Sequence, residues 1–335
     1  MSVDEILENL KAAASRGDVS AQTTLGKTLI AKPTSLQSFQ DGQLLLNQAL
    51  GAGSGEAAEF LAIMHAAGLR CQQDWPKALD YLAQAAALGW EPACQQLAIF
   101  ANVKDGAGRW NAAARDAQSL RKQVDIEALM RLPEKEILCQ APRIRKAENF
   151  LPHRFCDWMI ARARPSLGRA RTYDETAADG RENTIRTNSS VSFNILELDL
   201  ILLLIQSLIS KITDVPMFTM ENSSVLHYET GQQFRAHYDY LDPNKPAHAA
   251  DMRKFGQRLA TCLVYLNDDF EGAETSFPKI NKKIRCKKGG ALLFVNVDEN
   301  GQPDPNTLHA GLPPTSGEKW LFSQWIRTGP MPENS

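Results

Sequence analysis

The chain of 335 residues lacks the features that mark several classes of protein. Its formal net charge is only -2, so no overall electrostatic field favours a nucleic acid or an anionic membrane. Its longest apolar run, residues 198–210, is too short to cross a bilayer and contains polar side chains. We therefore expect a buried helix there, and neither a nucleic-acid partner nor a membrane partner.

Cysteine is scarce and scattered. The six cysteines, at positions 71, 94, 139, 156, 262 and 286, contain no C-x-x-C pair and no paired spacing. We expect reduced thiols rather than disulfides or a zinc site. The N-terminal stretch carries acidic residues early and no apolar core, unlike a signal peptide. These absences together predict a cytoplasmic protein.

Residues 1–103 are rich in Ala, Leu, Gln and Gly and repeat every 36 residues. The repeat aligns three columns, which are Gly17, Gly53 and Gly89; Ala21, Ala57 and Ala93; and Leu25, Leu61 and Leu97. We expect each glycine to end one helix and each alanine to lie near the start of the next, where helices approach closely. This pattern favours a helix–turn–helix solenoid over a non-repetitive helical bundle. The units resemble Sel1-like repeats, relatives of the tetratricopeptide type, which usually offer a concave surface to a protein partner.

The pattern changes after the repeats. Residues 104–138 predict a helical linker with Pro133 as the expected stop. From residue 139 onward, short alternating segments rich in β-branched and aromatic side chains are separated by Gly, Pro, Asn and Asp. Many short strands with turn signals predict a β-sandwich or barrel of the jelly-roll kind.

His237 and Asp239 stand one residue apart in the segment GQQFRAHYDYLDP. In a strand, residues i and i+2 face the same way, so an imidazole nitrogen and a carboxylate can aim at one point. Such a short pattern also arises by chance. His227 and Glu229 have the same spacing, and the chemistry of the residues alone does not separate the two pairs.

A metal site needs a third ligand, and the chain has only six histidines. His65 lies in the repeats, His153 begins a predicted helix, and His248 lies in a loop-like stretch. His309 directly precedes a strongly strand-like segment and is the best candidate. Two histidines and a carboxylate on adjacent strands form the facial triad of non-haem Fe(II) oxygenases, which leaves coordination positions open for a 2-oxo acid and O₂.

The far carboxylate of a 2-oxo diacid needs a cation if it is to be buried. Lys319 opens a predicted strand in which alternation puts Lys319, Leu321, Ser323 and Trp325 on one face. A pocket-facing lysine would suit this role. The alternative is a solvent-exposed lysine at the start of an edge strand.

Three segments resemble, in order and spacing, the catalytic domain of prolyl 4-hydroxylase-type Fe(II)/2-oxoglutarate-dependent dioxygenases. They are VLHYETGQQFRAHYDY, RLATCLVYLNDDFEGAETSFP and KKGGALLFVNVDENGQPDPNTLHAGLPPTSGEKWLFSQWIR. The resemblance covers roughly residues 139–328. It implies a two-domain α+β protein, with the helical solenoid followed by a double-stranded β-helix core, jelly-roll or cupin-like with flanking helices, over residues 139–330.

The resemblance also implies roles for individual residues. The residues that match the metal ligands and the cosubstrate pocket are His237, Asp239, His309, Lys319, Tyr228 and Tyr265. Lys319 would bind the C5 carboxylate of 2-oxoglutarate together with Tyr265. On the substrate side, the resemblance points to Trp325 and to Arg186, which lies in a loop over residues 181–193. Ala273 departs from the family pattern, in which glycine is usual.

The implied reaction is hydroxylation that requires Fe(II), 2-oxoglutarate and O₂, with ascorbate as the expected reductant, and yields succinate and CO₂. The favoured substrate is a prolyl residue in a peptide or protein. One alternative is a free cyclic amino acid or a natural-product intermediate as substrate. Another is a repeat scaffold whose oxygenase-fold domain is a degenerate sensor. The repeats either recruit a protein partner or pack on the barrel and stabilise it.

Overall fold

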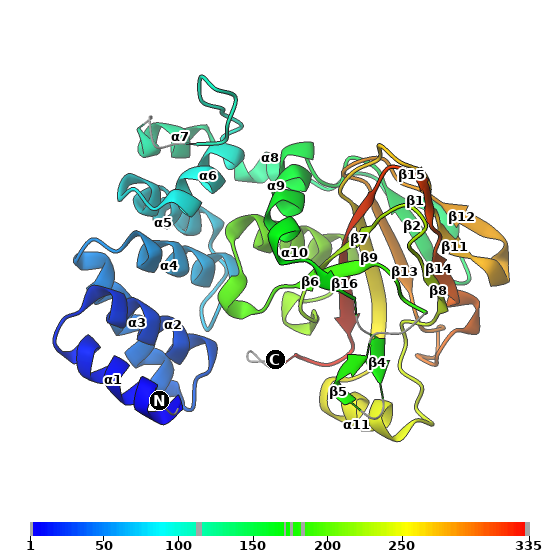
Figure 1. Cartoon of the computed structure of the whole chain (residues 1–335), viewed down its shortest axis with the longest axis horizontal. Coiled ribbons are helices and arrows are strands. Elements are labelled where there is room, and N and C mark those ends of the chain that lie inside the picture. Colours follow the sequence, from blue (N-terminus) through cyan, green and yellow to red (C-terminus); the bar gives the residue numbers. More distant parts are fainter. Residues whose placement is uncertain (1–2, 112–115, 171, 175–176, 182–184, 332–335) are drawn as a thin grey trace. The chain divides into compact units, whose positions relative to one another are not determined.

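A computed structural model describes residues 3–111, 116–170, 172–174, 177–181 and 185–331 (Figure 1). The chain divides into two compact units. One unit comprises Met1–Arg131 with Ile195–Ser207, and the other comprises Leu132–Asn194 with Leu208–Glu333. Helix α10 (Leu200–Thr213) therefore has residues in both units.

The first unit contains the helices drawn in blue to cyan in Figure 1. They are α1 (Val3–Ser15), α2 (Val19–Ala31), α3 (Leu36–Gly51), α4 (Gly55–Ala67), α5 (Trp75–Ala87), α6 (Glu91–Phe100), α7 (Ala117–Gln123) and α8 (Ile126–Leu129). The predicted single linker helix is two short ones, α7 and α8, and α8 ends before Pro133. Part of the predicted linker, residues 112–115, lies outside the described residues.

The glycine and alanine columns of the repeat have the predicted roles. Gly17, Gly53 and Gly89 follow α1, α3 and α5 with φ of 86°, 92° and 79°, a left-handed conformation that glycine adopts without strain. The aligned alanines and leucines of α2, α4 and α6 are all buried. The helix starts thus recur every 36 residues, while a solenoid remains a prediction.

A buried polar network joins the start of α10 to this unit. Gln96 donates from Nε2 to Glu59 Oε1 at 2.5 Å, and its Oε1 accepts from the backbone N–H of Leu200 at 2.9 Å. Trp90 Nε1 donates to the other oxygen of Glu59 at 2.6 Å. The first N–H groups of a helix have no partner within the helix. At the start of α10, the side chain of Gln96 accepts from one of them, that of Leu200. Residues 200–209 of α10 are almost all buried, as predicted.

The second unit is built on two main sheets. The larger has the strand order β1-β2-β13-β9-β16-β7-β6-β3, and the smaller has the order β12-β11-β14-β8. The strands of the larger sheet are β1 (Glu136–Cys139), β2 (Ile144–Ala147), β3 (Gly168–Arg169), β6 (Ser189–Ser192), β7 (Ser224–Tyr228), β9 (Arg258–Tyr265), β13 (Ala291–Val295) and β16 (Lys319–Arg327). Those of the smaller sheet are β8 (Phe234–His237), β11 (Thr275–Phe277), β12 (Lys282–Ile284) and β14 (His309–Gly311). Two further pairs are β4 (Thr172–Asp174) with β5 (Ala177–Arg181), and β10 (Glu271–Gly272) with β15 (Pro314–Ser316).

The core of this unit lies between the two main sheets. One buried cluster combines Leu263, Phe294 and Leu321 of the larger sheet with Phe277 and Ile284 of the smaller. Two sheets that share one apolar core form the sandwich that strand alternation predicted.

Two helices complete the second unit. Helix α9 (His153–Ala163) starts after Pro152, as predicted. Helix α11 (Pro246–Phe255) contains His248, so the prediction of a loop there was wrong. Pro246 occupies the first turn, where its fixed φ favours a helix and its missing N–H costs nothing. None of the helices in the described residues is both long and apolar enough to span a membrane.

Strand β16 lies inside the larger sheet, between β9 and β7. Lys319, its first residue, has an exposed fraction of 0%. The alternative of a solvent-exposed lysine on an edge strand was therefore wrong.

Candidate metal centre

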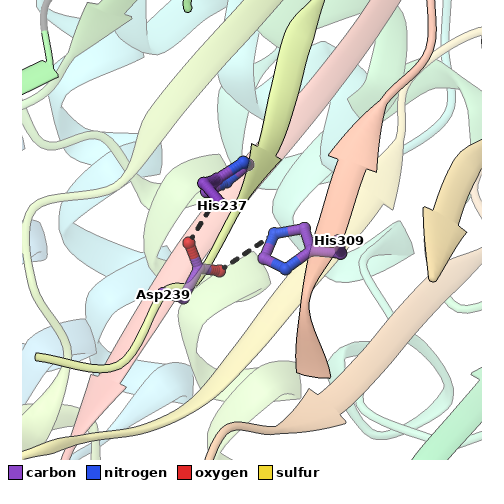
Figure 2. A group of neighbouring side chains, drawn as sticks. All are labelled: His237, Asp239 and His309. Carbon is purple, nitrogen blue, oxygen red and sulfur yellow. Dashed lines mark ion pairs between the residues drawn. The ribbon is translucent and has the colours of Figure 1, made fainter. Parts of the chain in front are cut away.

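The strand pairing of the smaller sheet brings three distant side chains together. His309 of β14 lies directly opposite His237 of β8 in the antiparallel ladder, and Asp239 follows two residues later. The two carboxylate oxygens of Asp239 each lie 3.5 Å from Nε2 of one imidazole (Figure 2). The possible ligand atoms of the three residues all lie within 4.8 Å of one another.

The second histidine–carboxylate pair with the same spacing, His227 and Glu229, does not contribute to this cluster. His227 is buried, with Nε2 2.7 Å from Glu318 Oε2 and its ring 4.1 Å from the Trp320 ring centroid. Glu229 is exposed. Within the described ranges, His237, Asp239 and His309 are the only set of three potential ligands this close together.

Hydrogen bonds orient all three side chains. His237 Nδ1 lies 2.8 Å from the carbonyl oxygen of Arg235, and His309 Nδ1 lies 3.0 Å from that of Thr307. A carbonyl can only accept, so each Nδ1 carries the proton and each Nε2 presents a lone pair toward Asp239. Thr261 donates from its hydroxyl to Asp239 Oδ2 at 2.7 Å.

Burial and neighbouring groups set the charges. Burial opposes ionisation of Asp239, but the neighbouring His309 and His237 and the hydrogen bond from the Thr261 hydroxyl together hold its pKa well below the usual range. Burial lowers the pKa of His309 to about 4, so its imidazole is neutral near pH 7. A carboxylate and imidazole nitrogens on one side of a cavity are a donor set suited to a divalent iron ion.

A buried cation lies at the other end of the site. Lys319 Nζ donates to the carbonyl oxygen of Ala273 at 2.6 Å and lies 4.9 Å and 5.7 Å from the ring centroids of Tyr265 and Tyr228. Ala273 has a φ of 57°, the left-handed region, which an alanine adopts at some cost in strain. Burial lowers the pKa of Lys319 to about 7. A buried amine with this environment is a ready partner for an anion.

The two tyrosines are placed differently. Tyr265 donates its hydroxyl hydrogen to the carbonyl oxygen of Ile284 at 3.1 Å and lies 2.9 Å from the Thr275 hydroxyl. The Tyr265 hydroxyl thus has two protein partners in this structure, and its pairing with Lys319 at a carboxylate stays a prediction. Burial raises the pKa of Tyr228 to about 12, so its hydroxyl stays protonated.

A cavity of about 800 Å³ connects the predicted residues. Seven of the eight line it, namely His237, Asp239, His309, Lys319, Tyr228, Arg186 and Trp325. Tyr265 is fully buried and is not one of the residues that line the cavity. Arg186 comes from the segment 181–193, which was predicted to be a loop, but its residues 189–192 form strand β6 and residues 182–184 lie outside the described residues.

The sequence analysis missed a row of hydroxyl groups on the cavity wall. Ser192, Ser224 and Ser323 are directly paired across β6, β7 and β16, and all three line the cavity. The Ser192 and Ser224 hydroxyls lie 2.7 Å apart. Beside this row, the Arg258 guanidinium lies 3.5 Å from the Trp325 ring centroid. Period-two alternation places Ser323 on the same face of its strand as Lys319. The sequence does not show that β16 pairs with β7, and β7 with β6, so it does not show that the three serines lie in one row.

Comparisons with known proteins identify relatives of this chain. The family model of the 2OG-Fe(II) oxygenase superfamily matches residues 223–327. Prolyl 4-hydroxylase 1 of Arabidopsis thaliana is 33% identical over 244 residues, which are 68% of this chain and 84% of that protein. Prolyl 4-hydroxylase 5 of the same plant is 32% identical over 210 residues, which are 57% and 70%.

One similar solved structure is a viral collagen prolyl hydroxylase from Paramecium Bursaria Chlorella virus-1 in complex with 2OG. It is 29% identical, and the match covers 55% of this chain and 94% of that one with a TM-score of 0.42.

Metal binding should depend on Asp239 and on the threonine that holds it. Asp239→Ala should raise the Kd for Co(II) by more than about 100-fold, and Thr261→Val by about 10–100-fold, because the latter removes only the orienting hydrogen bond. Isothermal titration measures both. His227→Gln is the matched control and should bind Co(II) like the wild type. Equal Kd values for Asp239→Ala and wild type would contradict the assignment of the triad.

The affinity for 2-oxoglutarate should depend on pH through Lys319. Because the Lys319 pKa is lowered to about 7, its ammonium loses a proton as the pH rises through that value. A dianion prefers the charged form, so Kd should be nearly constant below about pH 7 and rise up to about tenfold per pH unit above it. Calorimetry on Mn(II)-loaded protein measures this. Because arginine stays charged, the Kd for 2-oxoglutarate of Lys319→Arg should not rise above about pH 7. A rise that persists in this variant would show that another group titrates.

Proposed function

Because the chain belongs to the prolyl 4-hydroxylase family of 2OG-Fe(II) oxygenases, we propose that it hydroxylates a prolyl residue in a peptide or protein, using Fe(II), 2-oxoglutarate and O₂. The observation that carries this proposal is the convergence of His237, Asp239, His309 and Lys319 on one cavity.

His237, Asp239 and His309 would hold the iron. The two Nδ1 hydrogen bonds to backbone carbonyls support this role, because they fix the tautomer in which Nε2 is free to coordinate. When bound, the iron with 2-oxoglutarate and O₂ supplies the oxidation that replaces C–H by C–OH and releases succinate and CO₂. The residues described here contribute ligand geometry, charge and a largely buried site.

Lys319 would bind the far carboxylate of 2-oxoglutarate. Tyr228 is the better hydroxyl partner than Tyr265, since Tyr265 already donates its hydrogen to Ile284 and Tyr228 lines the cavity. Tyr265 would act through its ring, which lies 4.9 Å from the Lys319 ammonium. A cation facing an aromatic ring is stabilised by the electrons of the ring face.

The substrate would lie against the wall formed by Ser192, Ser224, Ser323 and Trp325. A cavity of about 800 Å³ is larger than 2-oxoglutarate and one free amino acid require, which favours a longer substrate. Hydroxyl groups both donate and accept, so a row of them suits the alternating N–H and C=O groups of a peptide. Trp325 and Arg258 add an aromatic and cationic surface to this wall, and Arg186 lines the same cavity.

The remaining assignments are part of the same proposal. We propose that residues 1–103 are Sel1-like repeats that hold a protein partner, which the 36-residue recurrence of helix starts supports. We propose a cytoplasmic location, which six cysteines without a disulfide support. Ascorbate is proposed as the reductant that keeps the iron in the ferrous state.

Succinate release tests the function. Wild type with Fe(II), ascorbate and 2-oxoglutarate should release succinate faster with proline-rich peptides than with free proline or pipecolate, and mass spectrometry should find one added oxygen on proline. Asp239→Ala should be inactive. Stimulation by a free amino acid alone would favour the small-molecule hydroxylase. Tight binding of Co(II) and 2-oxoglutarate without turnover on any substrate would favour the sensor.

The serine row should affect peptide recognition. Ser224→Ala removes one hydrogen-bonding group from the wall and should raise the KM for a peptide substrate roughly 3–10-fold, since one hydrogen bond contributes about 0.5–1.5 kcal/mol. The KM for 2-oxoglutarate should change less. Ser189→Ala is the matched control, because Ser189 neighbours the row on β6 but pairs with His227, away from the cavity. Equal effects of the two substitutions would contradict a substrate contact at Ser224.

A further inference from the structure

The two histidines of the triad have different surroundings. His309 belongs to β14, which has β11 on one side and β8 on the other, and its side chain is 6% exposed. The rings of Phe294 and Phe277 lie 4.7 Å and 5.8 Å from its imidazole. His237 ends β8, the outer strand of this sheet, and its side chain is 18% exposed. The sheet and the core therefore fix His309 more fully than His237.

The Phe234 ring supports His237, which the sheet and the core hold less fully than His309. The two ring centroids are 3.5 Å apart and the ring planes differ by 13°, so Phe234 covers one face of the imidazole. Residues i and i+3 of a regular strand face opposite sides. Here the register is irregular, because His309 pairs with His237 but Gly311 pairs with Phe234. The additional residue in β8 is a β-bulge, which brings Phe234 and His237 to the same side.

Arg186 in turn holds Phe234. Its guanidinium carbon lies 4.7 Å from the Phe234 ring centroid, and its Nε donates to Asn188 Oδ1 at 3.1 Å. The Arg186 side chain is 8% exposed and Asn188 is fully buried. A cation over an aromatic face is attracted to it, and the attraction strengthens when water is excluded. Arg186 is thus anchored on one side and rests on the Phe234 ring on the other.

The backbone around Arg186 is also joined to β8. Ile185 accepts from the N–H of Arg235 at 2.8 Å, and the N–H of Thr187 donates to Gln233 at 2.9 Å. These bonds place residues 185–187 antiparallel along the edge of β8 that no other strand of its sheet occupies. The segment therefore satisfies edge groups of the strand that carries His237.

We propose that Arg186, Phe234 and His237 form a stack that fixes the plane of the His237 imidazole, which makes Arg186 and Phe234 positioning residues of the metal centre. This rests on the proposed function in that His237 binds the metal. The imidazole is attached at Cγ and restrained at Nδ1 by the Arg235 carbonyl, and within the tolerance of that one hydrogen bond the ring can still tilt by rotation about its Cβ–Cγ bond. The stacked Phe234 ring removes the tilt and keeps water from one face. Arg186 thus has a role beyond the substrate contact implied by the resemblance.

Co(II) binding by the full chain tests the stack without turnover. Phe234→Leu keeps an apolar side chain but removes the ring, and it should raise the Kd for Co(II) about 10–100-fold, the usual effect of losing a group that orients a ligand. It should also shift the visible absorption of bound Co(II). Phe234→Tyr keeps the ring and should bind like the wild type. Tyr238→Leu is the matched control, because Tyr238 lies between the two ligands of the segment but stacks on Tyr240.

Arg186→Met keeps most of the side-chain length without the charge and should raise the Co(II) Kd by at least about 3-fold, with a smaller spectral shift. Circular dichroism shows whether Phe234→Leu folds. If it does not, Arg186→Met alone tests the stack. If folded Phe234→Leu binds Co(II) with the wild-type Kd and shows the wild-type absorption, the proposed stack is wrong, while the triad is unaffected. If Phe234→Leu is unfolded, the same result in Arg186→Met leads to the same conclusion. Failure of the wild type to bind Co(II), or undiminished binding by Asp239→Ala, would instead overturn the triad and the proposed function with it.

Discussion

The site depends on one pairing, that of β8 with β14. His237 and His309 are separated by more than seventy residues of chain, and only their direct opposition in the antiparallel ladder puts both imidazoles at one end of the cavity. The smaller sheet can hold this register because its apolar face is buried against the larger sheet. A slip of one residue in β8 would turn Phe234, which packs against this core, to the opposite face of the sheet, so the hydrophobic core favours the alignment of the two histidines.

Two buried ionisable groups line the cavity, and both are costly to the fold. Asp239 is offset by the Thr261 hydroxyl and two imidazoles, and Lys319 by the Ala273 carbonyl and two aromatic rings. The compensation is uneven. The pKa of Asp239 remains low, which shows a well-supported carboxylate, whereas the pKa of Lys319 falls to about 7, which shows an ammonium whose lost hydration is only partly replaced. An anion that contacts Lys319 would therefore replace the stabilisation of its ammonium that burial removed.

Local patterns predicted the parts of the site that follow from strand alternation. Period-two alternation was enough to predict that His237 and Asp239 face the same way and that Lys319 points inward. The 36-residue period was enough to predict repeat helices that end at glycine. The predictions that failed needed tertiary information. The stretch around His248, predicted as a loop, is a helix that begins at Pro246. The hydrogen bond from the Tyr265 hydroxyl to Ile284, a residue nearly twenty positions away, is likewise a contact that strand alternation does not reveal. Phe234 was missed because alternation places it opposite to His237, and one additional residue in β8 reverses that.

Lys319 and His237 differ in how fully the sheets hold the strands that carry them. Lys319 and Tyr228 come from strands in the interior of the eight-stranded sheet, where each strand is hydrogen-bonded on both sides. His237 comes from an outer strand with a bulge, and its second neighbour is the short segment 185–187. That segment belongs to the same part of the chain as the serine row, since Ser192 of β6 follows it by only a few residues. A group that contacts this wall therefore acts on a stretch of backbone that is hydrogen-bonded to the strand of a metal ligand. In this architecture the serine row and the strand of His237 are joined through the backbone, while Lys319 is held by the interior of the larger sheet and by the Ala273 carbonyl.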